Sequence, residues 1–433
     1  MDRFSALPDE ILDLISGEVQ EPRSLFYMSL VSKNCYHVFS RRLYESVKSG
    51  DKQIDTLALL ENERIPLTSP HPASFVKTLE LEFFPLDPEW DVEEKEWQEQ
   101  ETIRENLFKR QADSALNNVA KYAILRRLSL RFPKIHLHKG LGKLNSIKLG
   151  HLRHLAVRCL ILEHQSLDIF ESLCRSSRTL NHLELHWDEW NDSPEAVARL
   201  LEVIPKACSN LQGIRMSTSF YPESYEPVQR VLDDPNFTFP LLDNCHCNDF
   251  MQCNALKFLE RHPKIEKLQV SNVNIGDPED EELDLVNGLA NAKTLRQLDL
   301  TDYSMNTMSL VLLASVTKAC PKLTHFKCAL GNEKSMASRC PTFPDLIYST
   351  IFRNLPNLEH LRLQFRHASD PEADMFQNSY FQVLASRHPL KTMQIDILVI
   401  CAQRAQWKCF YFMKDNNRII PAPKLDANRF DWF

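Results

Sequence analysis

Residues 295–300 read Leu-Arg-Gln-Leu-Asp-Leu, and their spacing of apolar residues, apolar-x-x-apolar-x-apolar, recurs along most of the chain. The further copies begin at Val76, Leu125, Leu152, Leu180, Leu211, Ile265, Leu323, Leu358 and Leu390. From Leu125 onward the starts lie 27–35 residues apart, except for one interval of 54, which is twice 27. Alternation of apolar and polar residues predicts a half-buried strand, and a fixed period near thirty residues predicts a solenoid of stacked repeats.

Amphipathic stretches lie between the strand-like copies and predict helices. They cover residues 166–175, 194–207, 281–292, 308–319 and 376–387. Prolines that stop a helix and favour extended backbone precede four strands, at Pro263, Pro321, Pro356 and Pro389. The sequence therefore predicts an α/β solenoid with a parallel sheet on its concave side and helices outside, in the pattern of leucine-rich repeats.

The match to the leucine-rich-repeat pattern is incomplete after each strand. The asparagine or cysteine of that pattern is replaced at Asp188, Val273, Tyr303, Gly331 and Arg366. An internal asparagine ladder is therefore not expected, and we predict an irregular, curved array. The missing copy inside the 54-residue interval predicts that residues 217–250 form either a distorted repeat or a loop.

The first fifty residues predict three short helices rather than a repeat. Pro8 suits a first helical turn, and the acids at Asp9 and Glu10 favour a helix N-terminus. A second helix is expected over residues 25–31 and a third over 34–47. Three helices in so short a segment enclose a very small core, which is marginally stable alone, so we expect this unit to bury a surface against a partner.

Residues 7–12, Leu-Pro-Asp-Glu-Ile-Leu, together with residues 30–33, Leu-Val-Ser-Lys, closely resemble the F-box in the variant common among fungal proteins. The resemblance covers residues 4–48 and includes Tyr36 and the pair at 43–44. It implies that the helical unit binds the Skp adaptor of a Skp–cullin–F-box ubiquitin ligase. The residues it places at this contact are Leu7, Pro8, Ile11, Leu12, Leu30 and Val31. Cys35 departs from the family, which usually has an aromatic residue there, and a plain helical cap on the solenoid is the alternative.

The predicted organisation has four parts. Residues 1–50 form the F-box, 51–124 a linker and N-terminal cap, 125–400 the leucine-rich-repeat solenoid and 401–433 a C-terminal cap. An acidic insertion over residues 87–101 interrupts the cap. We expect it to be a solvated loop, with the alternative that it folds over a basic surface of the solenoid.

That basic surface follows from the alternation within strands, since residues between the apolar positions face the concave side. The cations at these positions are Arg127, Arg131, Arg158, Arg215, Lys267, Lys327 and Arg362. We expect them to bind an acidic or phosphorylated segment of a substrate protein, because arginine clusters pair well with phosphate. An ordinary solvated face is the alternative.

Composition and motifs exclude several other functions. A net charge of −7 argues against a nucleic-acid partner, and with 9 glycines the chain contains none of the common phosphate-binding loops. No signal peptide or apolar run of membrane-spanning length is present, and the scattered cysteines indicate a reducing compartment, cytoplasmic or nuclear. The cluster of Cys245, His246 and Cys247 lacks a second pair of zinc ligands, and His182 and His186 flank Glu184 without a nucleophile. We therefore expect no metal, no cofactor and no catalysis.

The resemblance and the repeat together predict a non-enzymatic substrate-recognition subunit of a Skp–cullin–F-box E3 ubiquitin ligase. Its expected partners are the Skp adaptor, through it a cullin–RING ligase, and an unknown substrate protein. Two alternatives stay open: a leucine-rich-repeat scaffold without ligase association, and an enzyme with its site on the concave surface.

Overall fold

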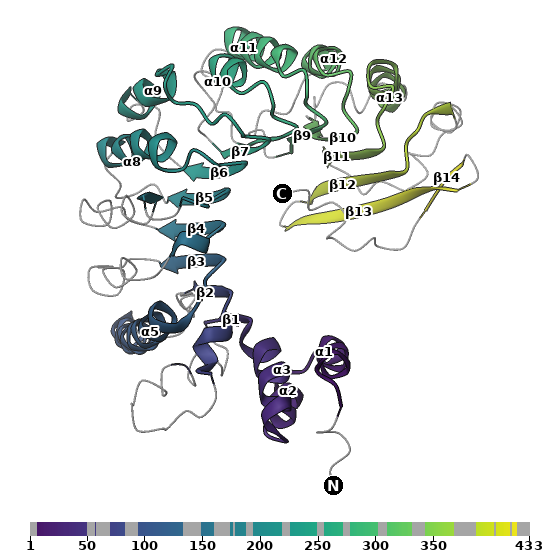
Figure 1. Ribbon diagram of the computed structural model, residues 1–433. Coiled ribbons are helices and arrows are strands. Elements are labelled where there is room, and N and C mark those ends of the chain that lie inside the picture. Colours follow the sequence, from purple (N-terminus) through teal and green to yellow (C-terminus); the bar gives the residue numbers. More distant parts are fainter. Residues whose placement is uncertain are drawn as a thin grey trace. The chain divides into compact units, whose positions relative to one another are not determined.

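The computed structural model divides the chain into two compact units, Met1–Leu211 and Gln212–Phe433 (Figure 1). The residues it describes are 7–49, 57, 70–82, 94–132, 149–159, 174–175, 178–187, 194–218, 226–248, 255–271, 278–301, 310–330, 343–367, 387–401, 404–415 and 418–421. Each unit is taken by itself below.

The first unit begins with the three predicted helices, α1 (Asp9–Glu18), α2 (Pro22–Ser29) and α3 (Lys33–Tyr44). The Ser32 hydroxyl caps α3 by accepting a hydrogen bond of 3.2 Å from the Cys35 N–H. Leu12, Leu25 and Phe39 are buried between the helices. Cys35 is buried as well, so a small side chain fills the position where the F-box has an aromatic.

Two helix ends differ from the prediction. The second helix stops at Ser29, which leaves Leu30 and Val31 in the turn before α3. The third stops at Tyr44 rather than Val47, because residues Ser46–Lys48 form a strand, β1, that pairs with the first solenoid strand. Val47 is buried in that strand, so the β-branched residue serves sheet packing rather than the helix.

Five parallel strands form the sheet of the first unit. They are β1, β2 (Thr78–Glu82), β3 (Arg127–Phe132), β4 (His154–Cys159) and β5 (His182–Trp187), each paired with the next. The apolar positions of each copy are buried, as at Leu128 and Leu130 of β3. Short 3₁₀ helices, η1 (Pro72–Phe75) and η2 (Leu149–His151), precede β2 and β4.

The helices of the first unit's repeats are α5 (Glu94–Tyr122) and α8 (Pro194–Ala207), the latter with the predicted bounds. The prediction of a solvated loop over residues 87–101 is wrong from Glu94 onward, where α5 begins. Glutamate, glutamine and lysine have high helix propensity, and acids are favourable in a first helical turn, so this acidic composition suits a helix. Residues 87–93 lie outside the described part.

The second unit repeats the same arrangement (Figure 1). Its parallel strands are β6 (Gly213–Thr218), β7 (Asn244–Asn248), β8 (Lys267–Ser271), β9 (Gln297–Leu300), β10 (His325–Leu330), β11 (His360–His367) and β12 (Thr392–Cys401). Its helices are α9 (Glu226–Asp233), α10 (Ala255–Arg261), α11 (Pro278–Asn291), α12 (Leu310–Ala319) and α13 (Phe343–Asn354). Helices α11 and α12 confirm two predicted segments, whereas 376–386 and 166–173 lie outside the described residues.

Strand β7 fills the interval of 54 residues and settles the choice between a distorted repeat and a loop for residues 217–250. Leu242 and Cys245 occupy the first two apolar positions and are buried, and the backbone of Cys247 takes the third, beside Met216 and Val270. The repeat escaped the sequence pattern because cysteines stand where other copies have larger apolar residues. Cysteine behaves as a small buried hydrophobe, so the strand keeps its place.

The chain reverses direction after β12. Strands β13 (Arg404–Asp415) and β14 (Arg418–Pro421) pair antiparallel at this edge of the second unit's sheet. The pairing spans Thr392 to Cys401 on β12, so β13 covers the whole last parallel strand.

Side chains at the helix-to-strand turns bond to the preceding repeat. The Thr179 hydroxyl donates to the Gly150 and Leu152 carbonyls at 3.0 and 2.8 Å, and the Thr294 hydroxyl donates to the Pro263 and Ile265 carbonyls at 2.8 and 2.9 Å. The Cys320 thiol reaches the Leu289 carbonyl at 3.9 Å, and burial raises its pKa to about 12, which keeps the donor proton on sulfur. The repeats are therefore tied at the edge where strands begin.

The helices in the described part of the chain include none with the length and apolar character needed to cross a membrane.

Candidate functional site

Exposed apolar side chains occur on α1, on α2 and in the turn after α2. They are Ile11, Leu14, Phe26, Tyr27, Leu30 and Val31, and are together called the α1–α2 surface here. Leu14 is 69% exposed and Leu30 65%, so neither contributes to the unit's core. Large apolar side chains exposed together on one short helical unit indicate an interaction site.

The predicted adaptor residues fall partly on this surface. Ile11, Leu30 and Val31 are exposed members of it, Pro8 is exposed at the start of α1, and Leu7 is half-buried. Leu12 is fully buried and packs in the helical core.

Sequence reasoning missed three members of the α1–α2 surface. They are Leu14, Phe26 and Tyr27. The helical spacing of Ile11 and Leu14 on α1 is a signal that was available, because residues three apart share a helix face and Leu12 points elsewhere.

Helix α3 is tied to the solenoid of the first unit. The Glu45 carbonyl, just after α3, accepts hydrogen bonds from the Lys77 and Thr78 N–H groups, each at 3.0 Å. The Lys77 ammonium donates to the Glu45 carboxylate at 2.5 Å, and this bond lowers the pKa of Glu45. Because β1 follows directly and pairs with β2, the helices and the first repeats form one packed body.

The second surface is the sheet face opposite to the helices, called the helix-free face of each unit. In the first unit it carries three of the predicted cations. Arg127 is exposed, whereas Arg131 and Arg158 are half-buried and are direct backbone partners on β3 and β4. Glu184 on β5 lies 3.1 Å from His154 Nε2 and 4.0 Å from Arg158.

In the second unit the predicted cations on β10 and β11 are already paired. Lys327 Nζ lies 2.9 Å from the Asp299 carboxylate, and both side chains are almost completely buried. Arg362 Nε donates to the Asp396 carboxylate at 2.6 Å, where the Gln394 amide also donates at 2.7 Å. The charges of Lys327 and Arg362 are therefore compensated by carboxylates on neighbouring strands of the sheet.

The two other predicted cations of the second unit do not adjoin each other. Arg215 is exposed on β6, and Lys267 is half-buried on β8, with β7 between them. The predicted basic row is thus a cluster on β3 and β4 in the first unit, together with separate or compensated cations in the second.

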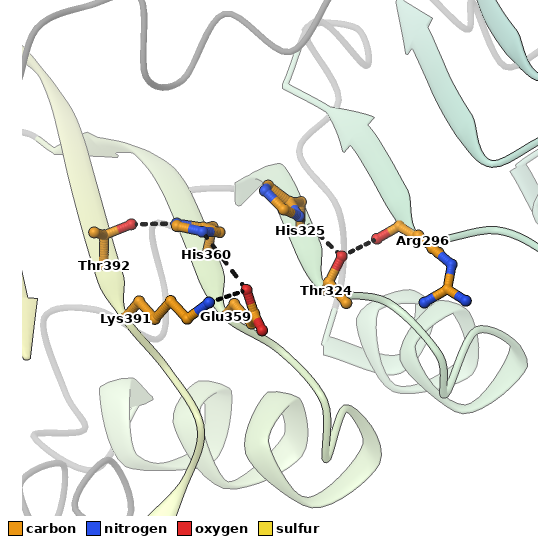
Figure 2. A network of polar contacts seen from close by, with 7 residues as sticks. All are labelled: Arg296, Thr324, His325, Glu359, His360, Lys391 and Thr392. Atoms are coloured by element: carbon orange, nitrogen blue, oxygen red, sulfur yellow. Dashed lines mark hydrogen bonds and ion pairs between the residues drawn. The ribbon is translucent and has the colours of Figure 1, made fainter.

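Two histidine rings lie side by side, tilted against each other, at the start of β10 and β11 (Figure 2). The rings of His325 and His360 have centroids 4.4 Å apart, and His360 Nδ1 lies 2.6 Å from the Thr392 hydroxyl. Burial, aided by the neighbouring His360, lowers the pKa of His325 to about 4, and burial also lowers the pKa of His360. Both rings are neutral at neutral pH and add no charge to this face.

The structure places the residues around Glu184 and Cys245 in ordinary strand positions. Glu184 contacts His154 and Arg158 on β4, and the His182 ring instead lies 3.0 Å from the Asn181 side chain. Cys245 is a buried core residue. Within the described ranges, histidines, cysteines and carboxylates form no group of three suited to a metal ion.

No protein-family model matches the chain, and a search of curated proteins finds no match. Among solved structures, the leucine-rich-repeat-containing protein LegL7 from Legionella pneumophila is similar at 11% identity and a TM-score of 0.38, over 82% of this chain and 89% of that one. The TLR13–ssRNA13 complex is similar at 10% identity and a TM-score of 0.35, over 75% of this chain and 46% of that one. The leucine-rich-repeat fold itself rests on the parallel strand register and the strand–helix alternation described above.

Proposed function

We propose that this protein is a substrate-recognition subunit of a Skp–cullin–F-box ubiquitin ligase, in which the α1–α2 surface binds the Skp adaptor and the solenoid captures a substrate protein. The observation that carries the proposal is the exposed apolar surface on a helical unit whose sequence resembles the F-box. Burying it on an adaptor would remove side chains such as Leu14 and Leu30 from water, at roughly 1.5–3 kcal/mol for each fully buried side chain.

The connection between the helices and the solenoid supports the same role. A receptor of this kind acts by holding its substrate near an enzyme that carries ubiquitin. A rigid connection between its two binding surfaces helps to keep the substrate there. Here Glu45, Lys77 and the β1–β2 pairing join α3 to the first repeats. No catalytic group is needed, because the proposed activity consists of binding the adaptor and the substrate.

Co-expression of the full chain with a Skp adaptor tests the proposal. The wild type should co-purify with the adaptor, and Leu30→Asp combined with Ile11→Asp should abolish this, because charges would have to be buried unpaired in the interface. Leu7→Ala combined with Pro8→Ala should weaken binding less.

Val311→Asp is the matched control. Val311 is 76% exposed on α12 in the second unit, so the change adds one such charge at an apolar surface position that is not part of the α1–α2 surface. It should leave co-purification unchanged. A wild-type chain that does not bind the adaptor would contradict the ligase role and leave a leucine-rich-repeat interaction scaffold.

A further inference from the structure

The turn that enters β3 carries an exposed apolar residue where other repeats carry a hydrogen-bond donor. Three residues before their strands, the side chains of Thr179, Asn210, Lys264, Thr294 and Lys322 donate to backbone carbonyls of the preceding repeat. Ile124 holds this position before β3, cannot donate a hydrogen bond from its side chain and is 58% exposed. Its side chain therefore does not tie the repeats together, and a partner that covered it would remove apolar surface from water.

The same turn places an arginine next to this isoleucine. Tyr122, Ile124 and Arg126 are exposed, and the two residues between them are buried. The Tyr122 ring stacks on the ring of His71 with their centroids 4.3 Å apart, which holds the start of the turn against the solenoid. An apolar and a cationic side chain therefore follow each other on the outer side of this turn.

A second arginine adjoins Arg126 on the next repeat. The Arg126 carbonyl accepts a hydrogen bond from the Arg153 N–H at 2.8 Å, and the two residues hold the same position, immediately before β3 and β4. Both are exposed, and among the described residues neither side chain has a carboxylate partner. On either side, this position carries Lys77, whose ammonium pairs with Glu45, and the neutral Asn181. Neither flanking position supplies a carboxylate, so the positive charge of the two arginines stays uncompensated.

Two turns of the second unit share one feature each with the turn into β3. Leu241 is apolar and 43% exposed three residues before β7, but Asp243 follows it where the turn into β3 has an arginine. Arg296 stands immediately before β9, but its N–H donates to the Glu266 carbonyl, so an acidic residue holds the adjacent position. The turns into β3 and β4 differ from both, because they combine an exposed apolar side chain with uncompensated cations.

We propose that Ile124, Arg126 and Arg153, together called the turn surface, bind a short acidic segment of a partner protein. An apolar side chain of that segment lies against Ile124, and each arginine binds a separate carboxylate. An aliphatic residue with two cations suits a peptide better than a nucleic acid, whose bases stack on aromatic side chains and whose phosphates need a longer basic row. The inference goes beyond the adaptor contact and does not depend on it.

Binding of labelled ten-residue Gly-Ser peptides to the full chain, followed by fluorescence anisotropy, tests the inference. The probe peptide carries a central leucine with two glutamates on each side. Matched peptides carry glutamine in place of every glutamate, or serine in place of the leucine. The probe should bind about tenfold more tightly than either matched peptide, and its affinity should fall with added salt because exposed ion pairs are screened.

Variants locate the binding site. Ile124→Ser should weaken binding of the probe about tenfold, and Arg126→Gln combined with Arg153→Gln should do the same. Leu241→Ser and Arg296→Gln are the matched controls, because they make the same changes at the equivalent positions before β7 and β9. Each control should change the affinity by less than about twofold.

Absence of binding by the probe would overturn the inference, and so would equal binding of the glutamine peptide. A control variant that weakens binding as much as Ile124→Ser would also overturn it, because the site would then not be the turn surface. A ten-nucleotide oligothymidine that binds more tightly than the probe, and loses affinity in the double arginine variant, would assign the surface to nucleic acid instead. Melting curves equal to that of the wild type show that each variant is folded.

Discussion

The helix-free faces of the two units are built from the same strand positions, but the charged side chains at these positions are paired differently. On β9 and β10 of the second unit, Asp299 and Lys327 pair at 2.9 Å with about 4% and 6% of their side chains accessible. On β3 and β4 of the first unit, Arg127 is exposed and Arg158 lies 4.0 Å from the Glu184 carboxylate. The direct partners on β9 and β10 hold opposite charges and compensate each other, whereas Arg131 and Arg158 hold like charges and have glutamates on the strands to either side, Glu82 opposite Arg131 on β2 and Glu184 beside Arg158 on β5.

A binding site therefore cannot be inferred from a cation at a strand position until the residue opposite it on the adjacent strand is known. Register makes Asp299 and Lys327 direct partners, and it makes Arg131 and Arg158 direct partners. The first pairing compensates charge, and the second concentrates it. Four changes break or sharpen this comparison, from the largest expected effect to the smallest.

Removing Lys327 should be the most destabilising. In Lys327→Met the Asp299 carboxylate would stay buried without its cation, with the Thr301 N–H and hydroxyl still donating hydrogen bonds at 3.0 and 2.6 Å. An uncompensated buried charge costs about 3–5 kcal/mol of stability. Urea denaturation should therefore show a free energy of unfolding lower by this amount in the variant. The double variant Asp299→Leu, Lys327→Met should regain most of the loss, and a single variant as stable as the wild type would show that the pair is not buried in solution.

Acidification should destabilise the second unit through His262. Its Nε2 accepts a hydrogen bond from the Phe239 N–H at 2.9 Å, its Nδ1 lies 2.7 Å from the Phe258 carbonyl, and burial lowers its pKa to about 4. The unfolded chain binds a proton near pH 6.5 and the folded chain only near pH 4, so stability is present above pH 6.5 and is lost as the pH falls toward 4.

The loss from His262 alone is about 3 kcal/mol at most, and His325 acts in the same direction. Urea denaturation at pH 7.5, 6, 5 and 4 measures it. His262→Gln should be less stable at pH 7.5 and should show a shallower dependence on pH. A dependence as steep as that of the wild type would assign the effect to other groups.

Removing the turn hydroxyls should affect both units alike. Thr179 and Thr294 each donate to two carbonyls of the preceding repeat. Thr179→Val and Thr294→Val should each cost about 1 kcal/mol, the usual net contribution of a hydrogen bond, in chemical denaturation. Clearly unequal losses would mean that the two units also differ at the edge where their strands begin.

Neutralising Glu184 should have the smallest effect on stability. Its contacts with His154 and Arg158 lie on a half-exposed surface, where ion pairs contribute less than about 1 kcal/mol. Glu184→Gln should therefore unfold at nearly the wild-type urea concentration. A free energy of unfolding lower by clearly more than about 1 kcal/mol would contradict the description of these contacts as surface ion pairs.

The repeat was predictable from the sequence because burial of one face of each strand imposes a fixed spacing of apolar residues. The copy from Leu295 to Leu300 displays this spacing. Strand β7 was obscured because Cys245 satisfies the same packing requirement with a less recognisable residue. Helix α5 was missed because the acidity of residues 94–101 was read as solvation, although the same residues favour helix.

The functional surfaces were less predictable than the fold. Ile11 and Leu12 look equivalent in the sequence, and only the packing of α1 against α3 makes Leu12 core and Ile11 surface. Lys327, Arg362 and Arg127 look equivalent in the sequence, and the partners of Lys327 and Arg362 become known only from the structure. Aligning consecutive copies would have shown Asp299 and Lys327 at the same strand position, which is the signal that was available.

Hydrogen–deuterium exchange of the full chain, with and without a purified Skp adaptor, tests the central claim most directly. Complex formation should slow amide exchange in residues 9–31, which contain α1, α2 and the turn after them, and should leave β6 to β12 unchanged. Exchange that is unaffected by the adaptor, or slowed only in the solenoid, would contradict the assignment of the α1–α2 surface.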